Sequence, residues 1–281
     1  MRVVDTLAEL LAEVHRLLRR WRVSEQDTDI WFRGVDKAKY KLLPKLYRPE
    51  CRELGEDNLF YRFQAYGAAL LPNHPGPWDW YFIAQHHGLP TRLLDWTDNL
   101  HTAAYFALAP YFEKTPLSEV IRKARSGRAV VGDPADPPVV WVLDASDLNR
   151  VTVGESVTLV PGEKDSERAS LWMPERVRRG RARTGLIQGR RISNLKPIAL
   201  LPPRTSERII AQQGVFTLHG AGTLSLKSYY GRQARHRLNQ IGLNPRKAHA
   251  MWRDLSLCGI NHFTVFPDLQ NLARHVYLSN A

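Results

Sequence analysis

Three short segments of the sequence place polar side chains among apolar and aromatic ones, which is what binding and catalytic sites require. In the first, residues 30–35, Arg33 follows two aromatic residues and precedes Gly34. The run predicts a strand, with Arg33 on the same face as Trp31 and at the strand's exit, where glycine lets a ligand or a backbone approach closely. Arg33 can then form paired hydrogen bonds to a phosphate or carboxylate. A structural salt bridge is the alternative.

The second segment, residues 85–97, has the highest density of polar groups. Asp95 stands beside Trp96 near the end of a predicted strand, so it is a candidate for a ligand contact or an acid–base role. The alternative is that Asp95 holds a buried histidine or arginine in place. The polar or aromatic candidates for substrate contacts in this segment are Gln85, His86, His87, Arg92, Trp96 and Thr97.

The third segment, residues 207–216, places Gln212 shortly before a predicted strand. This side chain can orient a substrate amide or satisfy backbone groups. The signatures of P-loop, dinucleotide-binding, zinc-protease and serine-hydrolase sites are absent from the sequence. His86 and His87 are adjacent, so on a helix they point about 100° apart and make a poor pair of metal ligands. We therefore expect no metal site.

The charge of the chain suggests an anionic partner. Its 281 residues carry 40 basic and 28 acidic side chains, a net charge of +12. Nucleic acid, a nucleotide or an acidic protein would suit this surplus, and so would mere solubility. A run without acidic residues at 176–191 predicts either a strip that contacts phosphates or a solvated face. Its arginines are Arg176, Arg178, Arg179, Arg181, Arg183, Arg190 and Arg191.

The cysteines and the apolar pattern bear on the compartment. Cys51 and Cys258 are far apart and belong to no C-x-x-C pair, which excludes a disulfide scaffold and suits a reducing compartment. Charged residues interrupt residues 1–21, so this segment resembles neither a signal peptide nor a membrane span. We expect a cytoplasmic protein without membrane contact.

The alternation of apolar runs predicts an α+β fold: a single domain whose central mixed or split β-sheet is flanked by helices. Residues 1–24 contain an amphipathic helix over 5–21, in which Thr6 and Glu9 fit a capping box. Residues 25–281 form the main body, with an insertion at about 110–138. Strands are predicted at 30–35, 93–96, 139–143, 197–201 and 214–218, and helices at 56–71, 79–87, 99–108 and from about 228 onward.

The three polar segments, in this order, resemble the FRG domain family, which takes its name from an aromatic-Arg-Gly motif. That motif is here Phe32-Arg33-Gly34, and further blocks of the resemblance are residues 85–97 with 103–107, and 208–216. The C-terminal residues 259–260 and 266–269 are also similar to the family's ending. The resemblance extends over about residues 25–275.

The block order is also similar, more weakly, to ADP-ribosyltransferase-type folds. This resemblance implies an NAD-consuming transferase or glycohydrolase without a metal, with a nucleic acid or a protein as possible acceptor and a role as a toxin or defence effector. It implies that Arg33 contacts the NAD phosphates or ribose and that residues 95–97 back the nicotinamide pocket. In such folds an acidic residue of the last strand stabilises the ribosyl cation. The positions in this sequence that correspond to that acid are Gln212 and, less well placed, Glu207. Because a glutamine carries no charge, either Glu207 or Asp95 stabilises the ribosyl cation, or the chemistry differs from the standard reaction.

The sequence leaves two further readings open. One is a nucleic-acid-binding module, and the other is a nucleotide-sensing module that binds without turnover. Trp31 of the first segment and Arg208 of the third complete the candidates for substrate contacts. The enzyme reading carries one structural expectation, that Arg33, Asp95 and Gln212 line a single cleft.

Overall fold

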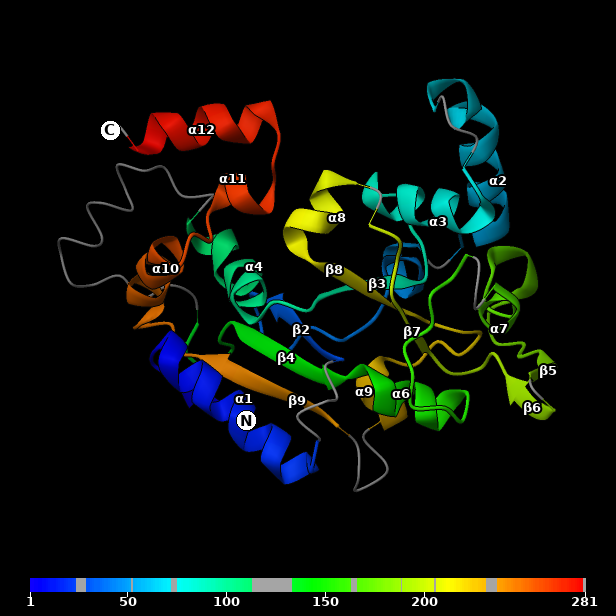
Figure 1. Cartoon of the computed structure of the whole chain (residues 1–281), viewed down its shortest axis with the longest axis horizontal. Helices are drawn as coiled ribbons and strands as arrows, with labels where there is room; N and C mark the ends of the chain where they lie inside the picture. Colours follow the sequence, from blue (N-terminus) through cyan, green and yellow to red (C-terminus); the bar gives the residue numbers. More distant parts are fainter. Residues whose placement is uncertain are drawn as a thin grey trace.

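The central element of the protein is a seven-stranded mixed sheet with the strand order β1-β9-β4-β2-β3-β8-β7 (Figure 1). The computed structural model describes residues 1–23, 29–51, 53–71, 75–112, 133–162, 166–187, 189–204, 206–230 and 237–279. β1 runs parallel to β9, and all other neighbours are antiparallel. The strands are β1 (Arg2–Val4), β2 (Ile30–Val35), β3 (Leu93–Thr97), β4 (Val139–Asp144), β7 (Ile198–Leu200), β8 (Gly214–Leu218) and β9 (Leu238–Leu243). The predicted α+β architecture is confirmed.

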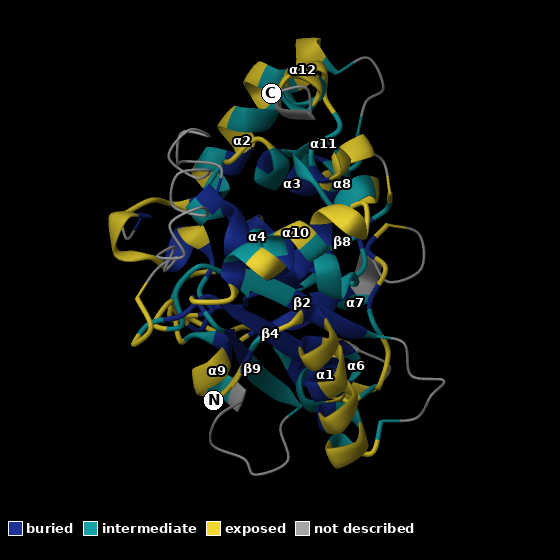
Figure 2. Cartoon of the chain, turned by 90° about the vertical axis from the view of Figure 1, so that its left-hand side faces the viewer, coloured by how far each residue is buried: buried dark blue, intermediate teal, exposed yellow. Residues whose placement is uncertain are grey.

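Helices flank this sheet. One apolar cluster joins α1 (Leu7–Trp21), α4 (Leu100–Phe112) and α10 (Ala248–Leu257) to strands β2, β4 and β9. A second cluster joins β2, β3 and β4 to α6 (Ala145–Thr152) and α9 (Leu226–Tyr230), and a third packs α2 (Glu56–Gly67), α3 (Pro77–His86) and α7 (Ser166–Ser170) near β3, β8 and β7. Figure 2 shows the buried strands in the middle of the molecule and the exposed outer face of α1. The remaining elements are α8 (Glu207–Gln212), α11 (His262–Val265), α12 (Leu269–Ser279), the hairpin β5 (Thr184–Ile187) and β6 (Arg190–Ser193), and the 3₁₀ turns η1 (Lys45–Tyr47), η2 (Pro49–Cys51), η3 (Ala68–Leu70) and η4 (Pro174–Arg176).

The N-terminal helix forms as the sequence predicts. The hydroxyl of Thr6 accepts a hydrogen bond from the backbone N–H of Glu9, and the Glu9 carboxylate accepts one from the backbone N–H of Asp5. The first bond satisfies a backbone N–H group that the helix start leaves without a partner. The second goes to Asp5, one residue before the N-cap that a full capping box would bind. The apolar face of α1 then packs onto the sheet, so the helix belongs to the main core.

The sheet is discontinuous between its fourth and fifth members, β2 and β3. β2 pairs with β4 at six positions and β3 pairs with β8 at five, whereas β2 and β3 pair only where Phe32 faces Thr97. The ladder therefore ends at this pair, and the two strands diverge from Arg33 and Trp96 onward. Backbone groups at such an opening need other partners.

Gly34 keeps its place in the motif because α4 crosses β2 there. A Cβ atom on Gly34 would lie 1.8 Å from the backbone oxygen of Ala103 and 2.6 Å from the backbone nitrogen of Ala107. Only glycine permits this approach. Of the two options that the sequence leaves open for this glycine, close approach of a ligand or of a backbone, the structure selects the backbone of α4.

Four strands were not expected from the sequence: β1 and β9 of the main sheet, and the hairpin strands β5 and β6. The prediction of helices throughout the region after 228 is wrong at residues 238–243. β9 contains Asn239, Gln240 and Gly242, which are rare in strands, and it forms because β4 and β1 pair with it on both sides. β1, only three residues long, pairs with β9 in turn. Residues 113–132 of the predicted insertion lie outside the described residues. In the described part of the chain, no helix is both long enough and apolar enough to cross a membrane.

Candidate functional site

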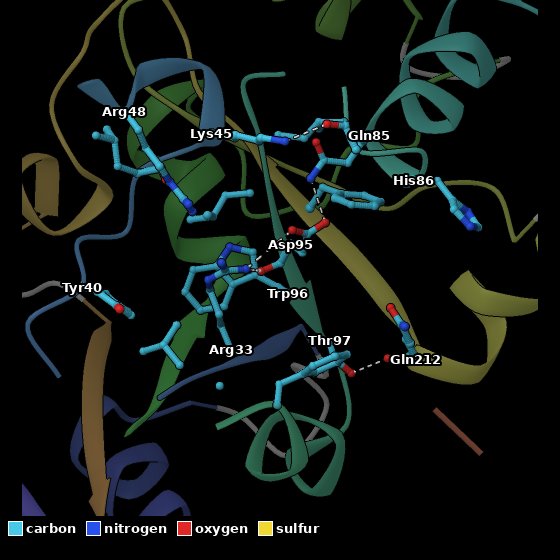
Figure 3. A pocket seen from close by; sticks show the side chains of 18 of the residues that line it. Arg33, Tyr40, Lys45, Arg48, Gln85, His86, Asp95, Trp96, Thr97 and Gln212 are labelled. Carbon is cyan, nitrogen blue, oxygen red and sulfur yellow. Dashed lines mark hydrogen bonds and ion pairs between the residues drawn. The ribbon is translucent and has the colours of Figure 1, made fainter. Parts of the chain in front are cut away.

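A pocket of about 1350 Å³ opens where β2 and β3 separate. Its wall includes residues from β2, the following loop with η1 and η2, the end of α3, β3 and α8. Arg33, Asp95 and Gln212 are all among the lining residues (Figure 3). As the sequence predicts, the three polar segments therefore meet in one cleft, although what each residue does chemically stays a prediction.

Arg33 occupies the gap in the sheet. Its guanidinium donates a hydrogen bond to the backbone oxygen of Asp95, which replaces part of the missing ladder, and lies 3.8 Å from the Asp95 carboxylate. The side chain is only 18% exposed. Burial lowers the pKa of Arg33, the Asp95 carboxylate opposes that shift, and Arg48 adds to it. Since arginine stays protonated in proteins, the pocket holds a largely desolvated cation.

Asp95 presents its carboxylate to the pocket, with 60% of the side chain exposed. The amide nitrogen of Gln85 donates to Asp95 Oδ1 over 2.9 Å, and the hydroxyl of Thr91 donates to Gln85 Oε1 over 2.6 Å. This chain of hydrogen bonds fixes the direction of the carboxylate from α3. Asp95 thus combines both readings of its position: it pairs with the mostly buried Arg33, and its own carboxylate stays exposed to the pocket.

The α8 side of the pocket carries Gln212 and Arg208. The Gln212 side chain donates to the backbone oxygen of Val265 over 3.2 Å, and its backbone oxygen accepts from the Thr97 hydroxyl over 2.7 Å. Arg208 lies over the ring of Phe266, 4.9 Å from its centroid. Gln212 therefore ties α8 to β3 and to α11, which positions the rim of the pocket.

His86 and His87 stand at the end of α3 and both line the pocket. Their rings stack with centroids 5.0 Å apart. Burial, followed by the charges of Arg208 and His87, lowers the pKa of His86 below its usual value. At neutral pH the pocket therefore has an uncharged imidazole at this edge, able to donate or accept a hydrogen bond.

Four residues that the sequence suggests for this site are not placed to contact a ligand as expected, although Trp96 does line the pocket. Trp31 is buried in the core between β2 and α6, and Glu207 is exposed on α8; neither is in the pocket wall. Trp96 is only 3% exposed, and its indole N–H donates to the Thr217 hydroxyl over 3.0 Å. A flat ligand ring is therefore not expected to stack on Trp96.

The fourth, Arg92, is fully buried behind the pocket. It forms an ion pair with Glu56, which also accepts a hydrogen bond from the Tyr81 hydroxyl. The guanidinium donates further to the backbone oxygens of Trp172 and His219. With its donors used in this way, Arg92 joins α2, β3, the segment after α7 and the end of β8, which is a structural role.

Sequence reasoning missed the loop between β2 and α2. Tyr40, Lys41, Lys45 and Arg48 all line the pocket. The Lys45 ammonium donates to the backbone oxygen of Gly88 over 2.9 Å, which joins this loop to the turn after α3. The available signal was five basic residues within positions 37–48, directly after the aromatic-Arg-Gly strand.

The arginines of residues 176–191 do not line this pocket. Arg178, Arg179, Arg181 and Arg183 surround a separate hollow of about 520 Å³, and Arg176, Arg190 and Arg191 are exposed outside it. In the residues that the structure describes, no group of three His, Cys, Asp or Glu side chains is placed to hold a metal ion.

Comparison with known proteins gives one match. Residues 28–115 match the model of the FRG domain. This range runs from β2 to α4, so it includes Arg33 and Asp95 and most of the loop and α3 walls, while α8 lies outside it. No curated protein and no solved structure matches the chain.

Proposed function

We propose that this chain, which carries an FRG domain over residues 28–115, is an enzyme that consumes NAD. The reaction is cleavage of the bond between ribose C1′ and the nicotinamide nitrogen, with transfer of ADP-ribose to an acceptor or to water. The observation that carries the proposal is the pairing of a desolvated cation, Arg33, with the pocket-facing carboxylate of Asp95, in a cavity of about 1350 Å³. The likeness to ADP-ribosyltransferase-type folds belongs to the same proposal.

The cations of the pocket suit a dinucleotide. Arg33 and Arg48 can each offer paired donors to a phosphate, and Lys45 adds a point charge at the rim. Because Arg33 is desolvated, its interaction with an anion is stronger than it would be in water. Tyr40, 45% exposed at the rim, is the ring that can stack on a flat base or on nicotinamide.

The bond cleavage needs a negative charge beside ribose. When the C1′–N bond breaks, its electron pair goes to nicotinamide, which leaves as a neutral molecule, and positive charge develops on the ribose. The carboxylate of Asp95, held by Gln85, can stabilise that charge in the transition state. Water or an acceptor group then bonds to C1′ and loses a proton to Asp95 or to solvent.

The two candidate acids give a direct experiment: release of nicotinamide from NAD by the purified protein, by Asp95→Asn and by Glu207→Gln. We expect release by the wild type, a loss of about 10²–10³-fold in Asp95→Asn, and a change of less than about twofold in Glu207→Gln. Glu207 is the matched control, because it is an exposed carboxylate outside the pocket wall. Equal losses in both variants would contradict the role of Asp95.

The outcome also separates enzyme from sensor. Saturable binding of NAD with no nicotinamide release, with or without cell lysate as a source of acceptors, would refute turnover and favour nucleotide sensing. Consumption of NAD would suit a toxin or defence effector. Expression of the wild type should then slow bacterial growth and lower cellular NAD, whereas expression of Asp95→Asn should do neither.

A further inference from the structure

The hollow surrounded by arginines is built on a tight, well-anchored turn. The backbone N–H of Arg181 donates to the oxygen of Arg178 over 2.9 Å, and Gly180, at φ +74°, donates to the oxygen of Ala221 over 2.8 Å. The turn is thus tied to the segment after β8, and its arginines are held close together. We call residues 178–183 the arginine turn.

Charge on the arginine turn is balanced only in part. Arg178 forms an ion pair of 2.6 Å with Asp57 of α2. Arg179 lies over the ring of Tyr47 at 5.2 Å and donates to the backbone oxygen of Leu46 over 2.7 Å. Arg181 and Arg183 are exposed and complete the hollow. Four guanidinium groups around about 520 Å³ favour an anion with several phosphates.

An exposed aromatic ring lies one helical turn from the carboxylate that binds Arg178. Tyr61 lies four residues after Asp57 on α2, which places it on the same face of the helix as the carboxylate that binds Arg178. Its side chain is 53% exposed. Few aromatic residues lie near the arginine run in the sequence, and the fold supplies the ring from α2. Arginines for phosphates and a ring for bases are the combination that single-stranded nucleic acid requires.

The arginine turn also borders the main pocket. Residues 45–51 lie between the two sites: Leu46 and Tyr47 contact Arg179, while Tyr47 and Arg48 line the pocket. The cations Lys45 and Arg48 therefore continue the positive surface from the turn toward the pocket. A flexible strand can follow such a path.

We propose that the arginine turn binds single-stranded nucleic acid, with phosphates on Arg178, Arg181 and Arg183 and a base stacked on Tyr61. An exposed ring one helical turn from the partner of Arg178 favours unstacked bases over a duplex, in which both base faces are covered. This inference does not depend on the NAD reaction. The three arginines outside the hollow, Arg176, Arg190 and Arg191, are not part of the site.

The test is binding of a fluorescent single-stranded oligonucleotide over a range of salt concentrations. The variants are the double substitution Arg181→Ala/Arg183→Ala, the single substitution Tyr61→Ala, and the control Arg246→Ala/Arg253→Ala. The control removes the same amount of positive charge from two exposed arginines, one just before α10 and one within it. In Figure 1, α10 lies at the opposite end of the molecule from the hairpin β5–β6 that follows the arginine turn. None of these residues lines the pocket, so nicotinamide release reports separately on the NAD reaction.

We expect Arg181→Ala/Arg183→Ala to weaken binding at least 10-fold at low salt. It should also reduce the slope of log K against log salt by about 1.4, since each phosphate contact to a single strand contributes about 0.7. Tyr61→Ala should weaken binding about 5- to 100-fold and leave the slope unchanged. The control should change Kd by less than about twofold.

The proposal would be overturned by no binding of the oligonucleotide, by equal losses in the control and in Arg181→Ala/Arg183→Ala, or by binding of a duplex as tight as that of the single strand with Tyr61→Ala unaffected. The last result would point to a general affinity for polyanions. An acidic polypeptide that competes as well as the oligonucleotide, at equal charge, would lead to the same conclusion.

Discussion

Arg33 lies on β2 and Arg92 directly before the neighbouring strand β3, and the sequence offers both as functional arginines. Arg92 is 1% exposed and bonded to Glu56 and to two backbone oxygens. Arg33 is 18% exposed, bonded to one backbone oxygen, and 3.8 Å from a largely solvated carboxylate. One guanidinium has its donors used by the protein, and the other keeps donors for a ligand.

This difference teaches how to separate structural from functional cations. A buried charge must be compensated, so the protein either supplies the partners itself or leaves a place for a ligand to supply them. For Arg92, burial lowers the pKa but Glu56 and Tyr81 more than offset it, and the net pKa is raised. For Arg33 the pKa is lowered. An incompletely compensated cation at a gap in the sheet is what a binding site for an anion needs.

The largest effect is expected from breaking the Arg92 network. Arg92→Met should lower the free energy of unfolding by about 3–5 kcal/mol, because it leaves the carboxylate of Glu56 buried without a counter-charge. Arg33→Met should cost less than about 1 kcal/mol, since its partner is exposed. Urea unfolding measures both. The double variant Arg92→Met/Glu56→Leu should recover part of the loss; equal costs for the two single arginine variants would refute the distinction.

Gly34 tests whether the motif combines chemistry with packing. Gly34→Ala should cost about 3 kcal/mol or more, because the new methyl group overlaps the backbone of α4 at Ala103. The matched control is Gly214→Ala, where the nearest atom would lie 3.7 Å from the added Cβ. It should change the free energy of unfolding by less than about 1 kcal/mol. Similar values for the two variants would show that α4 does not constrain β2 at this point.

His219 gives the smallest effect and a dependence on pH. Its ring is buried, neither ring nitrogen has a partner among the described residues, and burial and then the charge of Arg92 lower its pKa to about 3. The unfolded chain binds a proton near pH 6.5 and the folded one does not. Stability supplied by the neutral ring is therefore complete above pH 6.5 and falls by about 1.4 kcal/mol per unit down to about pH 3.

His219→Phe should remove that slope. The difference in unfolding free energy between the variant and the wild type should therefore grow by about 2 kcal/mol, in favour of the variant, when the pH falls from 6.5 to 5. Denaturant unfolding at several pH values measures it, with His15→Phe on the exposed face of α1 as a control for the loss of an imidazole. An unchanged slope would mean that His219 becomes protonated in the folded protein.

The strands that the sequence predicts correctly are those with a strong local signal. β2, β4 and β8 are runs of aromatic, β-branched and aliphatic residues buried on both faces. β9 has no such signal. It forms because it pairs with β4 and β1. Local pattern therefore predicts the centre of the sheet and misses the strands that depend on their neighbours.

The site shows the same division. Arg33, Asp95 and Gln212 could be selected from the sequence because each follows or precedes an apolar run in a dense polar segment. The sequence could not show which arginine has its hydrogen-bond donors occupied by the protein, because the partner of Arg92 is Glu56, 36 positions away. The cations of the loop at 40–48 were also missed: a loop carries no periodicity, and only the fold shows that it bends over the pocket.

The central claim is that Arg33 keeps donors for the phosphates of NAD. Isothermal titration with NAD tests it on the wild type, on Arg33→Lys and on Arg204→Lys, the last an exposed arginine outside the pocket wall. Lysine keeps the charge but cannot form paired hydrogen bonds. Arg33→Lys should therefore weaken binding about 10- to 100-fold, equivalent to about 1.5–3 kcal/mol, and Arg204→Lys by less than about twofold. Equal affinity of the wild type and Arg33→Lys for NAD would contradict the account.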